Sequence, residues 1–63
     1  MGEVKYLLGR ATLSQAQILY RQHKFGDARS EAVRAKEIYE QLGLAHDMQV
    51  CMDLLQDIEG AAG

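Results

Sequence analysis

The stretch FGDARSEAVRAKEIYEQLG, residues 25–43, decides the fold class. Its apolar residues recur at spacings of three and four, which is the period of an amphipathic helix. They are Ala28, Ala32, Ala35, Ile38, Tyr39 and Leu42. Three alanines in the first part of this stripe leave little side-chain bulk, so a second helix can approach closely there. Gly43 supplies the left-handed position at which helices commonly end. We therefore expect a helix over 27–42, with Asp27 as its N-cap.

Strong helix formers also dominate the sequence on both sides of this stretch, and the chain contains no Pro. Further helices are predicted over about 3–23 and 46–59, with Gly60 ending the last one and residues 60–63 forming a frayed tail. Both connections are short, so consecutive helices must be antiparallel. The sequence thus predicts an all-α fold, an antiparallel helical hairpin plus a third helix, in a single domain of residues 1–63.

A chain of 63 residues has a marginal core of its own, because it buries only about 60% of the surface that its unfolded form exposes. Small chains usually compensate with disulfides, a metal or a partner. One Cys excludes an intrachain disulfide, and two His with one Cys are a poor metal set. We therefore expect no metal or cofactor, and we expect a partner: another copy, or the rest of a larger protein.

Charge is divided unevenly along the chain. Residues 1–36 hold seven cations and three acids, a sum of +4, whereas residues 37–63 hold six acids and no cation, a sum of −6. This asymmetry suggests electrostatic pairing, inside the fold or between copies. The net charge of −2 argues against a generally basic nucleic-acid binder.

Several other functional classes lack their sequence signals. The apolar runs are far shorter than the roughly 20 residues of a membrane span, and the N-terminus has no secretory-signal pattern. A free Cys without an export signal suggests a cytoplasmic protein. His23 and His46 belong to different helix ends and form no acid-and-nucleophile arrangement. We expect a protein that is not an enzyme and binds neither membranes nor nucleic acid.

The first predicted helix is apolar on two faces. One face carries Val4, Leu8, Ala11, Ile18 and Leu19. The roughly opposite side carries Tyr6, Leu13 and Tyr20, each seven residues apart. A helix with two apolar faces needs two partners, and the other two helices can cover only part of it. We expect the stripe of Tyr6, Leu13 and Tyr20 to be available to a partner, with simple coverage of exposed helix surface as the alternative.

The third predicted helix repeats the pattern of the first. Its apolar stripe is Met48, Cys51, Met52, Leu55 and Ile58, in which Cys51 is expected to be a small core residue. A shift of 40 residues pairs Leu8 with Met48 and Ile18 with Ile58. A helix-turn-helix unit followed by the first helix of a second unit is typical of an α-solenoid segment.

These features resemble the tetratricopeptide repeat family. The resemblance rests on Phe25-x-x-Ala28, Ala32, Ala35, Ile38-Tyr39 and Leu42-Gly43, and it covers residues 8–59, about one and a half repeats of the longer variant of about 40 residues. It implies that Ala16 packs against Ala28 and that Phe25 fills the turn. Gln15 departs from the large apolar residue usual in the family. A three-helix bundle of the microtubule-interacting and transport type is the alternative.

The resemblance also implies a concave groove lined by the first helix of each unit. The groove positions fall on Arg10, Leu13, Gln17, Tyr20 and Arg21, and on Val50, Asp53 and Asp57. With Tyr6 added from the apolar stripe, these residues other than Val50 form the predicted protein-binding set. Asp53 and Asp57 place like charges on one helix face, and Arg10 and Arg21 of the same or another chain could neutralise them.

The function predicted from these patterns is a non-enzymatic protein–protein interaction module. It self-associates into a homo-oligomer through exposed apolar helix faces. One alternative is an adaptor segment of a larger repeat protein that binds a peptide or helix in its groove. A designed or excised repeat fragment without an independent function is the other.

Overall fold

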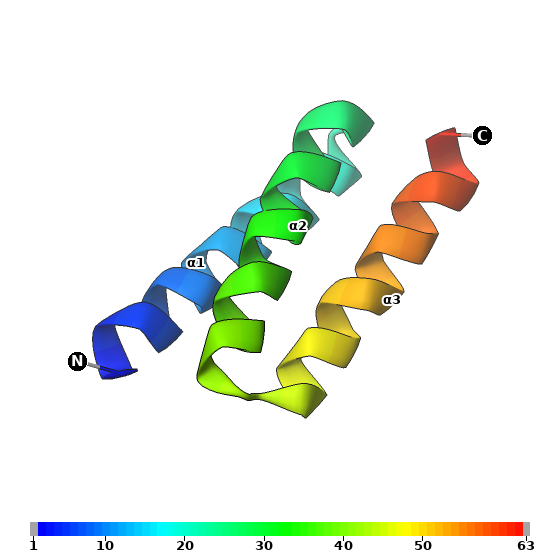
Figure 1. Cartoon of the computed structure of the whole chain (residues 1–63). Helices are drawn as coiled ribbons and strands as arrows, with labels where there is room; N and C mark the ends of the chain where they lie inside the picture. Colours follow the sequence, from blue (N-terminus) through cyan, green and yellow to red (C-terminus); the bar gives the residue numbers. More distant parts are fainter. Residues whose placement is uncertain (1, 63) are drawn as a thin grey trace.

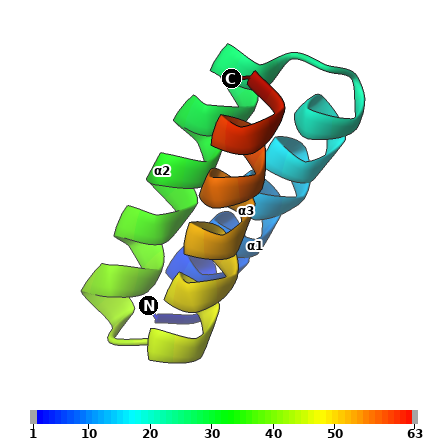
Figure 2. The ribbon, with the colours of Figure 1, turned by 90° about the vertical axis from the view of Figure 1, so that its right-hand side faces the viewer.

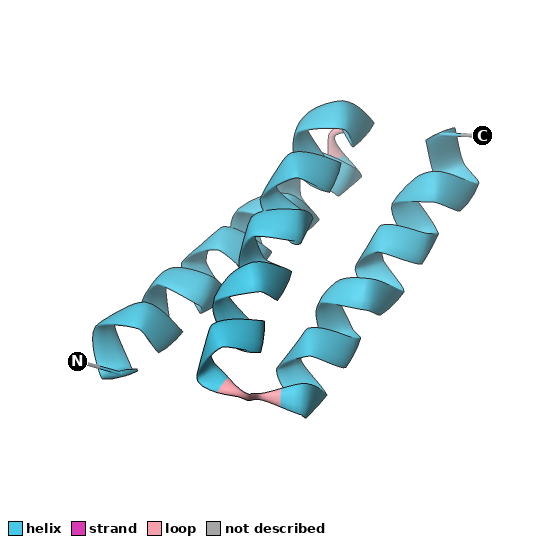
Figure 3. Ribbon diagram, in the orientation of Figure 1, coloured by secondary structure: helices cyan, strands magenta, loops and turns pink. Residues whose placement is uncertain are grey.

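The computed structural model describes residues 2–62, which form an all-α unit of three packed helices. They are α1 (Gly2–Arg21), α2 (Phe25–Leu42) and α3 (Ala45–Ala62), and no strand occurs within residues 2–62 (Figures 1 and 3). Consecutive helices are antiparallel, and the molecule is elongated, 37 Å in its longest dimension. The predicted fold class is therefore confirmed.

Helix α2 holds the fold together. It packs extensively against both of its neighbours, whereas α1 and α3 have little contact with one another. Figure 2 shows the three helices from a second side, with α3 in front of α1. Its buried residues include the three alanines of the predicted stripe, Ala28, Ala32 and Ala35, and each of them is fully buried. The deciding stretch of sequence therefore packs as its spacing predicted.

The C-terminal ends of α1 and α2 have the same pattern of backbone hydrogen bonds. At the end of α2, the Leu44 N–H donates to the Tyr39 carbonyl and the Gly43 N–H to the Glu40 carbonyl, with Gly43 in the left-handed region at φ 71°. This is the Schellman pattern, and it confirms the predicted role of Gly43. The end of α1 has the same pattern, but there the left-handed position is occupied by His23, at φ 62°.

Three predicted helix ends differ from the structure. Helix α1 ends at Arg21 rather than at residue 23, because His23 takes the left-handed conformation. Helix α2 begins at Phe25, so the N-cap position belongs to Lys24 and the prediction of Asp27 as N-cap is wrong. Asp27 lies in the first turn instead, where a negative charge interacts favourably with the helix dipole. Helix α3 continues through Gly60 to Ala62, so residues 60–62 are helical, while Gly63 lies outside the described residues.

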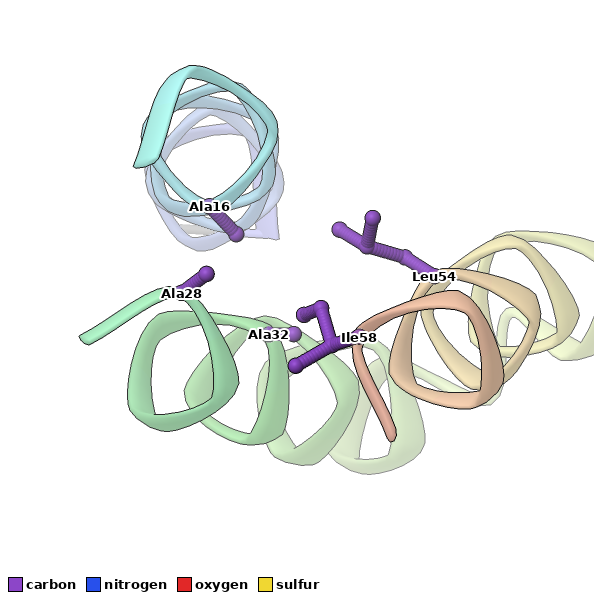
Figure 4. Packing of buried hydrophobic residues seen from close by; sticks show 5 residues of the cluster. All are labelled: Ala16, Ala28, Ala32, Leu54 and Ile58. Atoms are coloured by element: carbon purple, nitrogen blue, oxygen red, sulfur yellow. The ribbon is translucent and has the colours of Figure 1, made fainter. Parts of the chain in front are cut away.

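The core consists of two clusters along the helix bundle. One contains Ala16, Ala28, Ala32, Leu54 and Ile58 (Figure 4). In this cluster the side chains of Ala16 and Ala28 point toward one another, as predicted. The larger side chains of the cluster, Leu54 and Ile58, come from α3. The second contains Ala35, Tyr39 and Cys51, so the assignment of Cys51 to the core is confirmed. Leu54 is a core residue that the predicted stripe of the third helix omitted.

Gly9 allows a second close approach between α1 and α2. A Cβ atom at this position would lie 3.0 Å from Cε1 of Tyr39 and 3.1 Å from Cγ2 of Ile38. The absence of a side chain is therefore what lets α1 pack closely on the Tyr39 ring. Gly9 and Ala16 are seven residues apart, so both lie on the same face of α1.

Candidate interaction surface

The apolar residues predicted to be free for a partner are largely used by the fold itself. Tyr6, Leu13 and Tyr20 are half-buried, and Leu13 packs against both core clusters. The ring of Tyr6 lies 6.2 Å from that of Tyr39, and the ring of Tyr20 lies 5.8 Å from that of Phe25. These tilted ring pairs stabilise the contacts of α1 with α2, the second of them at the first residue of α2. Much of this stripe is therefore engaged in packing within the chain, and its use by a partner stays a prediction.

The small residues of α1 explain this orientation. Gly9 and Ala16 let α2 approach closely, so α1 turns this face toward α2. Positions three or four residues from either of them lie on the same side of the helix. Tyr6, Leu13 and Tyr20 stand at those positions, and they are therefore carried to the inside.

The polar members of the predicted protein-binding set remain at the surface. Arg10, Gln17 and Arg21 are exposed on α1, and Asp53 and Asp57 are exposed on α3. Asp53 accepts a hydrogen bond from Nε2 of Gln49 at 3.0 Å. No ion pair joins these arginines to these aspartates among residues 2–62, so the structure does not bring the predicted set together as a charged site.

Ion pairing inside the chain neutralises little of the divided charge. Across residues 2–62 the ion pairs are Arg29–Glu59, at 3.7 Å between α2 and α3, and Arg34–Glu31, at 3.4 Å within α2. Three of the four side chains are well exposed, and such pairs contribute about 0–1 kcal/mol each. Most of the charge therefore remains available for contacts between molecules.

The other side of α1 carries the main exposed apolar surface. Four of the five large apolar side chains that are exposed in the described chain lie on this helix: Val4 at 74%, Leu7 at 62%, Leu8 at 50% and Ile18 at 45% exposed. Ala11, which is also exposed, lies between them. We call these five residues the outer face of α1. The sequence pattern groups Val4, Leu8, Ala11 and Ile18 on one apolar face but predicts the partner-binding stripe on the opposite side. It does not single out Leu7.

The buried ionisable groups are part of the packing. Burial raises the pKa of the Cys51 thiol above its ordinary value, and the Asp47 carboxylate raises it further. Burial also raises the pKa of Tyr39, again with a smaller contribution from Asp47. Both groups are therefore held in their neutral, protonated forms at neutral pH, which makes Cys51 a poor nucleophile.

Residues 2–62 contain no group of three His, Cys, Asp or Glu side chains placed to hold a metal ion. None of the described helices is long and apolar enough to cross a membrane. An open depression between α1 and α2 is lined by Gln15, Leu19, Asp27, Ser30 and Glu31.

Comparisons with known proteins give no independent guide to this surface. No family model matches the chain, and no curated protein or solved structure matches it either. The tetratricopeptide resemblance therefore stays a prediction from the sequence.

Proposed function

We propose that this chain is a non-enzymatic protein-interaction module that associates with copies of itself. The observation that carries the proposal is the outer face of α1, where four large aliphatic side chains are left uncovered by the chain's own helices. Contiguous exposed apolar surface of this kind is a common mark of protein–protein contact sites. On so short a chain, it also offers the additional burial that a small core lacks.

The energetics favour association of moderate strength. Full burial of a large aliphatic side chain contributes about 1.5–3 kcal/mol, so completing the burial of these half- to three-quarter-exposed residues contributes about 1–2 kcal/mol each. Two copies together would gain about 8–16 kcal/mol, against an estimated cost of association of about 4–15 kcal/mol. A net gain of about 8 kcal/mol, which lies within the difference between these two ranges, corresponds to a micromolar dissociation constant.

The proposal also includes a tetratricopeptide-like repeat and a cytoplasmic location. The packing of Ala16 on Ala28 and the position of Phe25 at the turn support a tetratricopeptide-like repeat. The free, buried thiol of Cys51 is compatible with a reducing, cytoplasmic setting. The alternative of peptide binding in a groove has less support, because Leu13 and Tyr20, two of its three apolar members, pack against the core.

Sedimentation over a dilution series tests self-association. We expect the parent chain to sediment above its monomer mass of 7.0 kDa at micromolar concentration and its melting temperature to rise with concentration. A variant with Leu7→Gln and Leu8→Gln should shift toward the monomer while keeping its helical circular dichroism, because Gln and Leu have similar helix propensities.

A matched control is available on α2. Val33 is the remaining exposed large apolar residue of the described chain. It lies on α2 and is therefore outside the outer face of α1. Val33→Gln should leave the oligomer unchanged. A parent chain that stays a folded 7.0 kDa monomer across a hundredfold range of concentration would overturn the proposal.

A further inference from the structure

We infer that two copies of this chain pair through the outer faces of their α1 helices, antiparallel and about a two-fold axis at Ala11. This inference rests on the proposed self-association and names its surface and geometry. An isologous contact needs only one self-complementary patch, and the outer face of α1 is the patch on which the exposed aliphatic residues gather.

The spacing of the outer face fits helix pairing. Val4, Leu8, Ala11 and Ile18, with Gln15 between the last two, follow one another at alternating steps of four and three residues. This is the spacing of a seam between two packed helices. The small side chain of Ala11 stands at its centre and permits the closest approach of the two backbones there.

The antiparallel direction brings opposite charges together at the ends of the interface. With Ala11 on the axis, Val4 of one copy faces Ile18 of the other, and Leu8 faces Ser14 and Gln15. Near the ends, Glu3 of each copy comes close to Arg21 of the other. Neither Glu3 nor Arg21 forms an ion pair within residues 2–62. A parallel pair would instead keep Glu3 and Arg21 at opposite ends of the interface, where this pairing of opposite charges could not form.

The charge division alone suggests a different contact, in which α1 of one copy meets the acidic α3 of another. That arrangement would place the outer face of α1 against a polar surface, because none of the exposed large apolar residues of the described chain lies on α3. Pairing α1 with α1 buries aliphatic side chains from both copies. The occupant of this face is therefore α1 of a second copy.

Disulfide trapping of the full chain tests the geometry. Ala11→Cys places a thiol on the proposed axis, next to its counterpart in the second copy. Gln22→Cys, just beyond the end of α1, places its two thiols about 33 Å apart in an antiparallel pair, which is far beyond the Cα separation of about 7 Å that a disulfide tolerates. The parent chain, which carries only the buried Cys51, measures the background.

Under mild oxidation, we expect Ala11→Cys to form covalent dimers at least about tenfold faster than Gln22→Cys, because pairing raises the effective thiol concentration to about millimolar. Equally fast cross-linking of both variants would indicate parallel pairing and overturn the antiparallel geometry. No cross-linking of either, with the parent still oligomeric by sedimentation, would overturn this interface but not self-association. A monomeric parent would overturn both.

Discussion

The replacement of Gly9 by Ala isolates the contact that orients α1. Gly9 lies in the middle of α1, where Ala would ordinarily be the better helix former by about 0.8–1 kcal/mol. Here the added Cβ would lie 3.0 Å from Cε1 and 3.3 Å from Cζ of Tyr39, and 3.1 Å from Cγ2 of Ile38. The favourable helix propensity and the unfavourable steric contact therefore oppose one another at a single methyl group.

The steric contact should dominate. The shortest of these distances is about 0.5 Å below the lower end of the optimum for carbon contacts, which is 3.5–4.0 Å. Relief requires a shift of the Tyr39 ring, which is 1% exposed and held by the second core cluster. Overpacking of this kind costs about 1–3 kcal/mol. After subtraction of the gain in helix propensity, we expect Gly9→Ala to destabilise the fold by about 1 kcal/mol, or about 4–8 °C in melting temperature for a chain of this size.

The assay is thermal unfolding followed by circular dichroism at one fixed protein concentration, because association shifts the melting temperature. Gly60→Ala is the matched control: Gly60 lies in α3, and an added Cβ there would meet nothing within 4 Å. The control should be neutral or stabilising by up to about 1 kcal/mol. A melting temperature that rises for Gly9→Ala as it does for Gly60→Ala would refute the close packing of α1 on Tyr39.

Three further predictions concern the core, the left-handed residues between the helices and the buried ionisable groups. Ala28→Leu should overpack the contact with α1 and destabilise by about 1–3 kcal/mol, and an unchanged urea midpoint would show that the helix register is wrong. His23→Gly should stabilise by about 0.5–1 kcal/mol in thermal melts, because Gly relieves the left-handed strain; Gly43→Ala should do the reverse. The stability contributed by Cys51 and Tyr39 should be fully present at neutral pH and should fall as the pH rises past 9.0 and then 10.0, the ordinary pKa values of these two groups. Their raised pKa values keep both groups protonated in the folded state, while the unfolded state loses its protons. Urea midpoints against pH should fall less steeply in Tyr39→Phe, and an equal slope would count against the raised pKa of Tyr39.

The parts of the fold that the sequence predicted are those in which local signals and packing agree. The alanine stripe of α2, the stop at Gly43 and the burial of Cys51 each follow from a spacing or a residue type with one favourable structural role. The end of α1 and the start of α2 were misplaced because His23 adopts a left-handed conformation that is uncommon for residues other than Gly. A left-handed His carries no signal in the residue types around it.

The candidate surface could be predicted only in part, because α1 offers two apolar faces of similar length. Residue size decides between them, and hydrophobicity does not. Gly9 and Ala16 permit the closest approach to α2, so the face that contains them is buried although the opposite face holds more aliphatic side chains. The significance of Gly9 emerges only when Tyr39 is known to lie against it, and that contact joins residues 30 positions apart.

The same choice of face links the fold to the proposed association. Half of the eight buried apolar residues are alanines, and each contributes only about one methyl group of burial, on the order of 0.8 kcal/mol. Close backbone packing through Gly9 and Ala16 therefore gives precise geometry but little apolar area. The large aliphatic residues of α1 that would have supplied that area lie on the outer face. A second copy on this face would supply the missing burial, so the small residues that fix the fold of one chain also create the surface through which two chains can stabilise each other.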